Sequence, residues 1–353
     1  MKLTTFLKKY LFRILVILLM IAALAYFFVN LAQREELGEA FLQFTSANVL
    51  YLILALFLML ISLIIKAYRF YILIKASNPN LKFYKFLIPF FVGYGFSTLG
   101  PLKSGEIASV EINKRSLAVP RSSSIAAIAF FRVLDLFVVL ILFIIGLGTT
   151  IPGMVEEQYT LSLNIVFYIS LAGTVILSIL LFFPPFGRIF LRGVKAMVGK
   201  ISKKGRIWFE VKIDPALENY YTSLQYLYKQ IFLAGIVVVT TIVRWGLEFY
   251  SFKLTIMAFG ANISLLDAAS ISSVTLFVGL LTFVPAGLGT GTLTTQYLLE
   301  QMSIVPSIAA ASVIFQTIVG TGITLSVAAI SSFFVKEHEE SEKQEEEEWV
   351  ILK

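Results

Sequence analysis

The sequence predicts an all-α polytopic membrane helix bundle, with about six spanning helices and two re-entrant hairpins made of broken helices. Of its 353 residues, 58% are hydrophobic, and the mean hydropathy is +0.86. Soluble domains contain roughly 45–50% apolar residues. Several runs approach or exceed the roughly 20 apolar residues that cross a bilayer core. Lys and Arg gather in short segments between these runs, as is typical of the cytoplasmic loops of membrane proteins.

The loop charges predict the order and direction of the spans. The N-terminal segment is basic, residues 33–43 hold three Glu against one Arg, and residues 184–230 hold nine Lys or Arg against three acidic residues. Because Lys and Arg are retained on the cytoplasmic side, we expect a multi-pass protein of the cell membrane with both termini cytoplasmic. The first apolar run is too long for a removable signal peptide. The expected spans cover about residues 11–30, 49–72, 122–148, 162–183, 231–257 and 304–334.

A single transmembrane domain over residues 1–335 accounts for almost the whole chain. The longest polar stretch, 184–230, is too short and too basic to be a separate soluble domain, so we expect a cytoplasmic loop there. Residues 336–353 contain eight Glu and three Lys, a composition typical of a disordered, solvated tail. The alternative is a non-transporting scaffold that recruits soluble partners through this tail.

Two apolar segments are interrupted in the same way and predict hairpins at about residues 83–108 and 268–301. The first reads FVGYGFSTLGPLKSGE from Phe91, and the second reads FVGLLTFVPAGLGTGT from Phe277. Non-helical backbone at membrane depth is tolerated only where protein or a water-filled cavity covers it. The flanking charges make the two hairpins enter from opposite sides. Span, hairpin and span then occur twice in opposite orientation, which is the inverted repeat of many transporters.

Two pairs of charged residues lie inside the expected spans. Arg132 and Asp135 are three residues apart, and Arg244 and Glu248 are four apart, so each pair shares a helical face. One interpretation is that each pair neutralises itself and locks helices together. In the other, the arginines bind an anionic head group and the acids hold them in place, because charges at membrane depth usually face a bundle interior or a wet cavity.

The segments around the two breaks provide further candidates for anion binding. Lys66 is interpreted as snorkelling to the interface, whereas Arg69 fits either snorkelling or binding. A break at Pro101 exposes backbone N–H groups that favour anions, and Lys103 and Glu106 follow it; a solvated turn is the alternative. The second break contains no charged residue, and its candidate binding residues are Pro285, Gly287 and Gly289. The alternative interpretation is a flexible kink that lets helices pack closely.

The composition excludes several kinds of chemistry. The chain has no cysteine, which removes disulfides, thiolate metal ligands and thiol nucleophiles, and its one histidine, His338, lies in the acidic tail. We therefore expect no metal and no cofactor. No phosphate-binding loop of the Gly-x-x-x-x-Gly-Lys-Ser/Thr type occurs, so ATP-driven pumping is not supported. Nucleic acid is not expected as a partner, because the basic residues lie in short loops between spans. Whether the chain forms a homo-oligomer is left open.

From about Lys66 to Phe333, the chain resembles the lysylphosphatidylglycerol synthase transmembrane family, also called flippase-like membrane proteins. The resemblance rests on Arg69, the two charged pairs, and the segments PLKSGE from Pro101 and PAGLGT from Pro285. It implies movement of an anionic phospholipid or a polyprenyl-phosphate-linked lipid between leaflets. Larger relatives fuse this domain to a soluble aminoacyl transferase, and no such domain fits here.

Three positions depart from the pattern that is common in the family. Ser97 stands where an Asn is common, Thr292 where an acidic residue is common, and Ser109 where a basic residue is common. We expect a lipid translocase rather than an enzyme, with the head group nearer the first break than the second. The alternative is a membrane-embedded transferase acting on a lipid carrier, with Glu106, Asp135 and Glu248 as acids. The residues expected to bind substrate are Arg69, Pro101, Lys103, Glu106, Arg132, Asp135, Arg244, Glu248, Pro285, Gly287 and Gly289.

Overall fold

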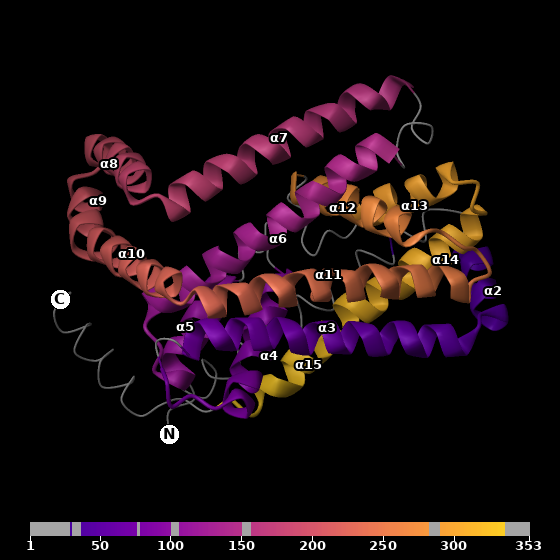
Figure 1. Ribbon diagram of the computed structural model, residues 1–353, viewed down its shortest axis with the longest axis horizontal. Coiled ribbons are helices and arrows are strands. Elements are labelled where there is room, and N and C mark those ends of the chain that lie inside the picture. Colours follow the sequence, from indigo (N-terminus) through magenta and orange to yellow (C-terminus); the bar gives the residue numbers. More distant parts are fainter. Residues whose placement is uncertain are drawn as a thin grey trace.

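The computed structural model describes Val29 and residues 37–75, 78–99, 106–149, 157–281 and 290–335. Within these ranges every regular element is a helix, which confirms the all-α prediction (Figure 1). Except for Val29, the expected first span lies outside the described residues. So do the acidic tail and the two breaks, with the candidates Pro101, Lys103, Pro285, Gly287 and Gly289.

Long apolar helices form the body of the molecule and confirm a polytopic membrane protein. A helix of 27 residues is about 40 Å long at 1.5 Å per residue, and this exceeds the roughly 30 Å of a bilayer core. Five helical stretches among the described residues meet the length and composition of a span: α3 (Val49–Lys75), α6 (Arg121–Thr149), most of α7 (Glu157–Phe182), α11 (Ile231–Ala258) and the stretch Pro306–Ser332.

The last of these stretches is not a uniform α-helix. Its α14 (Pro306–Thr317) and α15 (Thr324–Ser332) are separated by η4 (Ile318–Ile323), a short π-helix. A π-helical turn widens the backbone locally and is frequent at functional sites. A short helix at the start of the described chain, α2 (Leu37–Ser46), packs against α14.

Two pairs of shorter helices occupy the positions of the expected hairpins. The first pair is α4 (Phe83–Leu99) and α5 (Glu106–Leu117), and the second is α12 (Leu265–Leu281) and α13 (Thr290–Gln301). The helices of each pair pack against each other. The α5 helix continues nine residues beyond the expected end of the first hairpin, because polar residues extend it and Arg115 pairs with Glu111 one turn earlier at 2.9 Å.

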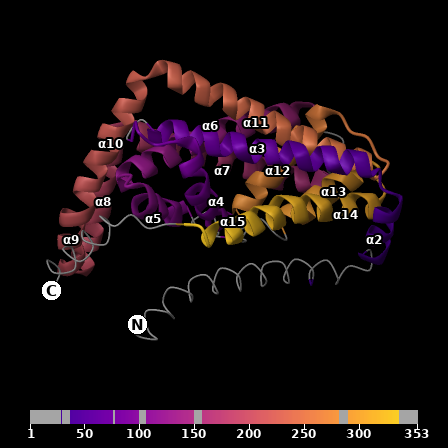
Figure 2. The same ribbon diagram turned by 90° about the horizontal axis from the view of Figure 1, so that it is seen from below.

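The two halves of the molecule exchange their hairpins. The α3 and α11 helices lie side by side, and they run in opposite directions (Figures 1 and 2). The α4 helix of the first half packs on α15 of the second half, and α12 of the second half packs on α6 of the first. The first hairpin joins the bundle at the end where α3 stops and α6 starts, and the second joins it at the opposite end. This packing agrees with the predicted inverted repeat.

Glycines bring both exchanged helices very close to their neighbours. A Cβ added to Gly95 of α4 would overlap the Cβ of Ala328 on α15. In the corresponding contact between α6 and α12, a Cβ added to Gly146 would lie 2.7 Å from the Cβ of Ser270. Small residues of this kind allow membrane helices to approach each other closely.

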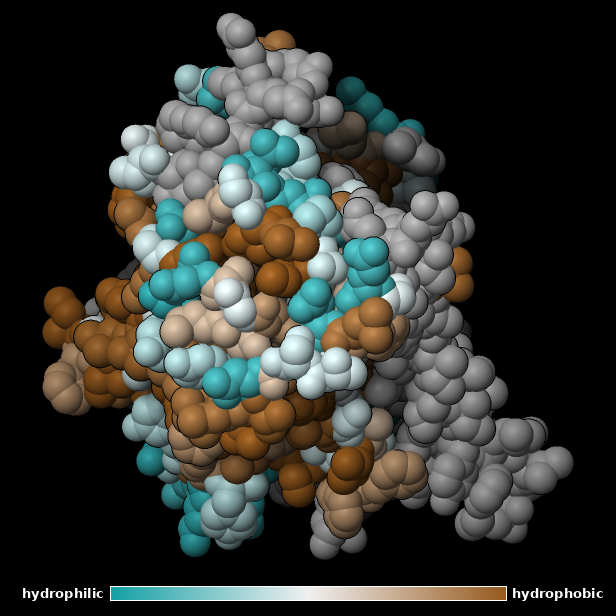
Figure 3. All heavy atoms as spheres, turned by 90° about the vertical axis from the view of Figure 1, so that its right-hand side faces the viewer, coloured by the Kyte–Doolittle hydropathy of each residue, from teal (hydrophilic) through white to brown (hydrophobic). Residues whose placement is uncertain are grey.

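The segment expected to be a basic loop, residues 184–230, is helical, so that expectation was wrong. It forms α8 (Pro184–Ile201), α9 (Lys203–Trp208), a π-helical turn η2 (Phe209–Ile213) and α10 (Asp214–Lys229). Apolar residues recur at helical spacing among the charges of α8, and this favours an amphipathic helix over a loop. Figure 3 views the opposite end of the molecule, where hydrophilic and hydrophobic side chains lie side by side.

Candidate functional site

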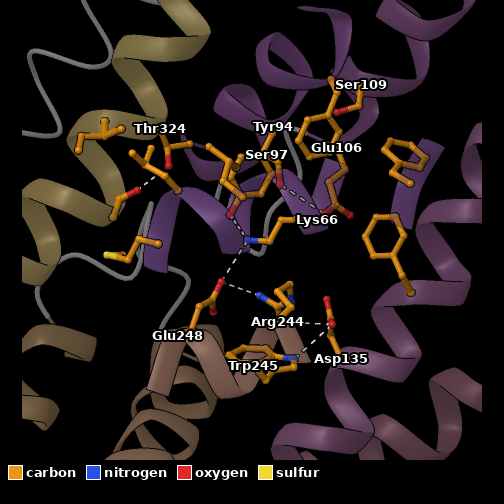
Figure 4. Close-up of a pocket in the computed structure, with 18 of the residues that line it drawn as sticks. Lys66, Tyr94, Ser97, Glu106, Ser109, Asp135, Arg244, Trp245, Glu248 and Thr324 are labelled. Atoms are coloured by element: carbon orange, nitrogen blue, oxygen red, sulfur yellow. Dashed lines mark hydrogen bonds and ion pairs between the residues drawn. The ribbon is translucent and has the colours of Figure 1, made fainter. Parts of the chain in front are cut away.

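A cavity of about 280 Å³ lies among the spans and the first hairpin. Its polar side contains charged and hydroxyl-bearing side chains from α3, α4, α5, α6, α11 and α15 (Figure 4). Those residues are Lys66, Tyr94, Ser97, Glu106, Ser109, Arg132, Asp135, Arg244, Glu248 and Thr324. The rest of the lining is mainly apolar and includes, from α3 and η4, Leu56, Met59, Leu60, Leu63, Val319 and Ile323. The cavity is therefore amphiphilic.

Asp135 is shared by two arginines beside the cavity. The Nη1 atom of Arg69 donates to Asp135 Oδ1 at 3.1 Å, and Nη2 of Arg244 donates to the same oxygen at 3.3 Å. The indole N–H of Trp245 is the third donor, at 3.2 Å. The side chains of Arg69, Asp135 and Arg244 are only 2%, 12% and 3% exposed, so this cluster joins α3, α6 and α11 in the interior.

Arg244 also connects Asp135 to a second carboxylate. Its Nη1 atom donates to Glu248 Oε1 at 2.7 Å, and its guanidinium lies 3.9 Å from the ring centre of Trp245. Glu248 further accepts a hydrogen bond from Ser62 at 2.9 Å. Lys66 lies 3.6 Å from the same carboxylate and donates to the hydroxyl of Tyr94 at 2.5 Å. Figure 4 shows Lys66 between Glu248 and the first hairpin.

A separate ion pair joins the first hairpin to α6. Glu106 is the first residue of α5, where the helix dipole favours a negative charge. Arg132 donates to its carboxylate, and the hydroxyl of Ser97 donates to it at 3.3 Å. The side chains of Arg132 and Glu106 are 23% and 18% exposed, so this pair is more accessible than the cluster around Asp135.

The charges of this region do not balance. Among the described residues, four cations (Lys66, Arg69, Arg132 and Arg244) share three carboxylates (Glu106, Asp135 and Glu248), which leaves one positive charge in excess. Several buried guanidinium N–H groups also have no hydrogen-bond partner in the described part of the chain: Nε and Nη2 of Arg69, Nε of Arg132 and Nε of Arg244. Uncompensated charge at membrane depth is costly, and an anion in the cavity would compensate it.

The π-helical turn provides part of the cavity lining. Val319, Gly320 and Ile323 of η4 line the cavity, and a Cβ added to Gly320 would lie 3.4 Å from Cε of Met59 on α3. Just beyond the turn, Thr324 donates its hydroxyl to the carbonyl of Gly320 at 2.6 Å. Such a bond to the carbonyl four residues earlier is common for Thr and Ser in helices.

Six of the residues selected from the sequence lie in or beside this cavity: Arg69, Glu106, Arg132, Asp135, Arg244 and Glu248. The self-neutralising pair expected for Arg244 and Glu248 is present. The corresponding expectation for Arg132 and Asp135 was wrong. Arg132 is long enough to reach Glu106 on α5, whereas the short Asp135 side chain stays between α3 and α11.

The cavity also contains residues that sequence reasoning missed. The interpretation of Lys66 as a snorkelling residue was wrong, because it contacts Glu248 and Tyr94 and is 19% exposed. Its spacing of three residues from Arg69 was the available signal. Trp245 and Tyr94 had no comparable signal. Of the second hairpin's described residues, only Leu276 lines the cavity, against Tyr94, Ser97, Glu106, Ser109 and others of the first.

Comparison with known proteins gives one assignment. A family model described as the lysylphosphatidylglycerol synthase TM region matches residues 10–328 of the chain. The match includes every described residue of the cavity. A search of curated proteins found no match.

Proposed function

The chain belongs to the lysylphosphatidylglycerol synthase transmembrane family, and we propose that it moves an anionic lipid between the leaflets of a membrane. The substrate is a phospholipid or a polyprenyl-phosphate-linked lipid. The observation that carries this proposal is the excess positive charge in a cavity that lies among the spans and is lined largely by apolar side chains. A soluble anion would not need this apolar lining.

The lipid head group binds at the more accessible cations, Lys66 and Arg132. A guanidinium donates two parallel hydrogen bonds to a phosphate, which suits Arg132 for this contact. The tail follows Leu63, Leu60 and Leu56, which lie at helical spacing on α3 and continue the face that carries Lys66. The buried cluster around Asp135 holds the three spans in position and attracts the anion through its charge.

Movement of the head group requires the two halves of the bundle to shift. In inverted-repeat transporters one repeat rocks against the other around a fixed site. We propose the same motion here, because each hairpin packs on the half opposite its own. This motion includes no chemical step, so we propose that the protein acts as a translocase and not as an enzyme.

The orientation is also a proposal. The end of the bundle that carries α8 to α10 is rich in Lys and Arg, whereas the described residues of the opposite end include Glu39, Asp267 and Glu300. By the positive-inside rule the basic end faces the cytoplasm. On the same basis we propose that both termini lie on the cytoplasmic side, and we propose the plasma membrane as the location.

Reconstituted vesicles test the proposal. Vesicles containing the protein and a trace of tail-labelled phosphatidylglycerol are treated with a membrane-impermeant reductant, which bleaches only the outer leaflet. The fraction of bleached lipid then reports movement between leaflets. We expect Arg132→Gln to slow this movement about tenfold or more, because one charge-assisted contact with the lipid contributes roughly 1.5–3 kcal/mol.

Arg115→Gln is the matched control, because Arg115 also pairs with a glutamate of α5, but this glutamate is Glu111, on the exposed face of the helix. It should leave lipid movement unchanged. Arg132→Lys keeps the charge but loses the two parallel N–H donors of the guanidinium, so its rate of lipid movement should lie between those of the wild type and Arg132→Gln. Equal rates for wild type and Arg132→Gln would refute the proposal. A change in the mass of the extracted lipid would instead favour a transferase that acts on a lipid carrier.

A further inference from the structure

The α8 helix lies where the chain leaves the span α7. Phe183 separates the two helices, and Pro184 and Pro185 open α8. Proline is well suited to the first turn of a helix but cannot continue a preceding one, so the chain turns here. The helices α8, α9 and α10 lie together at one end of the bundle (Figures 1 and 2). They therefore lie where the spans reach the membrane surface.

One side of α8 is held against α10 by ion pairs. Arg188 donates to Glu218 through two nitrogens, at 2.9 and 2.8 Å, and Lys195 donates to Asp214 at 2.7 Å. The hydrogen bond from Arg188 lowers the pKa of Glu218 below its ordinary value. The polar contacts of α8 thus face the protein.

A different side of α8 is apolar and uncovered. Phe186, Ile189, Phe190 and Met197 are 54%, 63%, 53% and 68% exposed. Their spacing of three, four and seven residues places them on one helical face. The exposed stripe of α10, at the same kind of spacing, is polar and consists of Glu218, Thr222, Gln225 and Lys229. The apolar stripe of α8 is therefore not repeated on the exposed side of its neighbour α10.

The charges beside the stripe all have one sign. Four basic residues and no acidic residue occur in α8. Two of the four, Arg192 and Lys200, are exposed and form no ion pair with any described residue. A helix with an apolar face and free basic residues is the kind that lies in the interface of an anionic membrane.

We propose that α8 is an interfacial helix, which inserts its apolar stripe among the lipid head groups of the anionic leaflet. Arg192 and Lys200 contact the lipid phosphates, while Arg188 and Lys195 keep the helix attached to α10. Two arguments favour a lipid surface as the occupant: the charge complementarity, and the position of α8 directly after a span. A second copy of the chain would present the same basic residues and so repel.

The absence of cysteine from the sequence allows a direct test, because a single introduced cysteine is the one site of labelling. Phe190→Cys and the control Gln225→Cys are each labelled with a nitroxide in the full-length protein. The proteins are reconstituted in phosphatidylcholine vesicles with and without phosphatidylglycerol. Collisions with oxygen, which enters the bilayer, and with a nickel chelate, which stays in water, then give the depth of each label.

In vesicles with phosphatidylglycerol, we expect the label at 190 to be shielded from nickel, open to oxygen, and about 5–10 Å below the phosphates. The label at 225 should be open to nickel. Arg192→Gln with Lys200→Gln should make the depth at 190 independent of phosphatidylglycerol. Equal nickel access at 190 and 225 would overturn the proposal. The proposal would also be overturned if the label at 190 were shielded from both reagents and its spectrum showed spin–spin broadening that disappears on dilution with unlabelled protein. That result would identify a second copy of the chain as the occupant.

Discussion

Replacing Asp135 by asparagine tests whether the buried cluster holds the three spans together. The substitution keeps the shape of the side chain but removes the charge that faces Arg69 and Arg244, which donate to one oxygen at 3.1 and 3.3 Å. Removing one partner of a buried ion pair costs about 3–5 kcal/mol, since the remaining charge is left uncompensated. Here two buried arginines, each at most 3% exposed, lose the carboxylate that they share.

Glu111 provides a matched control at the surface. It is also one carboxylate between two arginines, Arg115 and Arg121, with both closest contacts at 2.9 Å. The difference is exposure, because these three side chains are 34–44% exposed. Ion pairs of this kind contribute about 0.2–1 kcal/mol. We therefore expect Asp135→Asn to cost roughly 3 kcal/mol more than Glu111→Gln.

The assay is thermal unfolding of the purified variants in one detergent, followed by tryptophan fluorescence. Trp245, one of three tryptophans in the chain, donates to Asp135, so part of the signal comes from the cluster. Asp135→Asn should unfold several degrees below the wild type, and Glu111→Gln should unfold close to it. Adding Arg69→Met to Asp135→Asn should recover part of the loss, because it removes one uncompensated cation. Equal midpoints for Asp135→Asn and Glu111→Gln would show that the cluster does not stabilise the bundle.

Three smaller changes have defined outcomes. Gly95→Val should destabilise the protein by about 1–3 kcal/mol, because the new side chain overlaps Ala328, and unfolding midpoints would show it; an unchanged midpoint would contradict the close contact. Trp245→Phe keeps a ring beside Arg244 but removes one donor, so a loss of about 0.5–1.5 kcal/mol is expected. Because this variant lacks the fluorescent reporter, its unfolding is followed by circular dichroism beside the wild type; no loss would mean that this hydrogen bond is not needed. The lowered pKa of Glu218 means that its bond with Arg188 stabilises the α8–α10 contact above the ordinary carboxyl pKa and is lost as pH falls through the lower, folded-state pKa. Amide exchange in α8, corrected for its intrinsic pH dependence, should accelerate below about pH 4, and a flat profile would contradict this.

Hydropathy and loop charge were sufficient to predict the fold class. Each of the long apolar helices follows from a run of residues long enough to cross a bilayer, and this property is local. The π-helical turn at Ile318–Ile323 could not be predicted, because its residues fit an ordinary apolar helix. The helix α8 was missed for the opposite reason: its charges reduced the average hydropathy and concealed an amphipathic period.

The types of residue at the site could be predicted, but their partners could not. Spacing within one helix identified Arg244 and Glu248 as a pair, since the partner is one turn away. The partners of Asp135 come from α3 and α11, and sequence spacing contains no information about which helices meet. Lys66 was misinterpreted because a lysine near the end of a span usually reaches the interface, and the packing of the first hairpin over it was not visible.

The exchange of hairpins between the two halves has a consequence for synthesis of the protein. Gly95 on α4 meets its neighbour Ala328 only after another 233 residues have been made. At about 5–20 residues per second, the first hairpin waits roughly 10–50 s for the helix that covers it. During this interval, lipid or an insertion factor must shield the face that later packs on α15. The first half of the chain can therefore enter the membrane early, but it reaches its final packing only when the last span has been inserted.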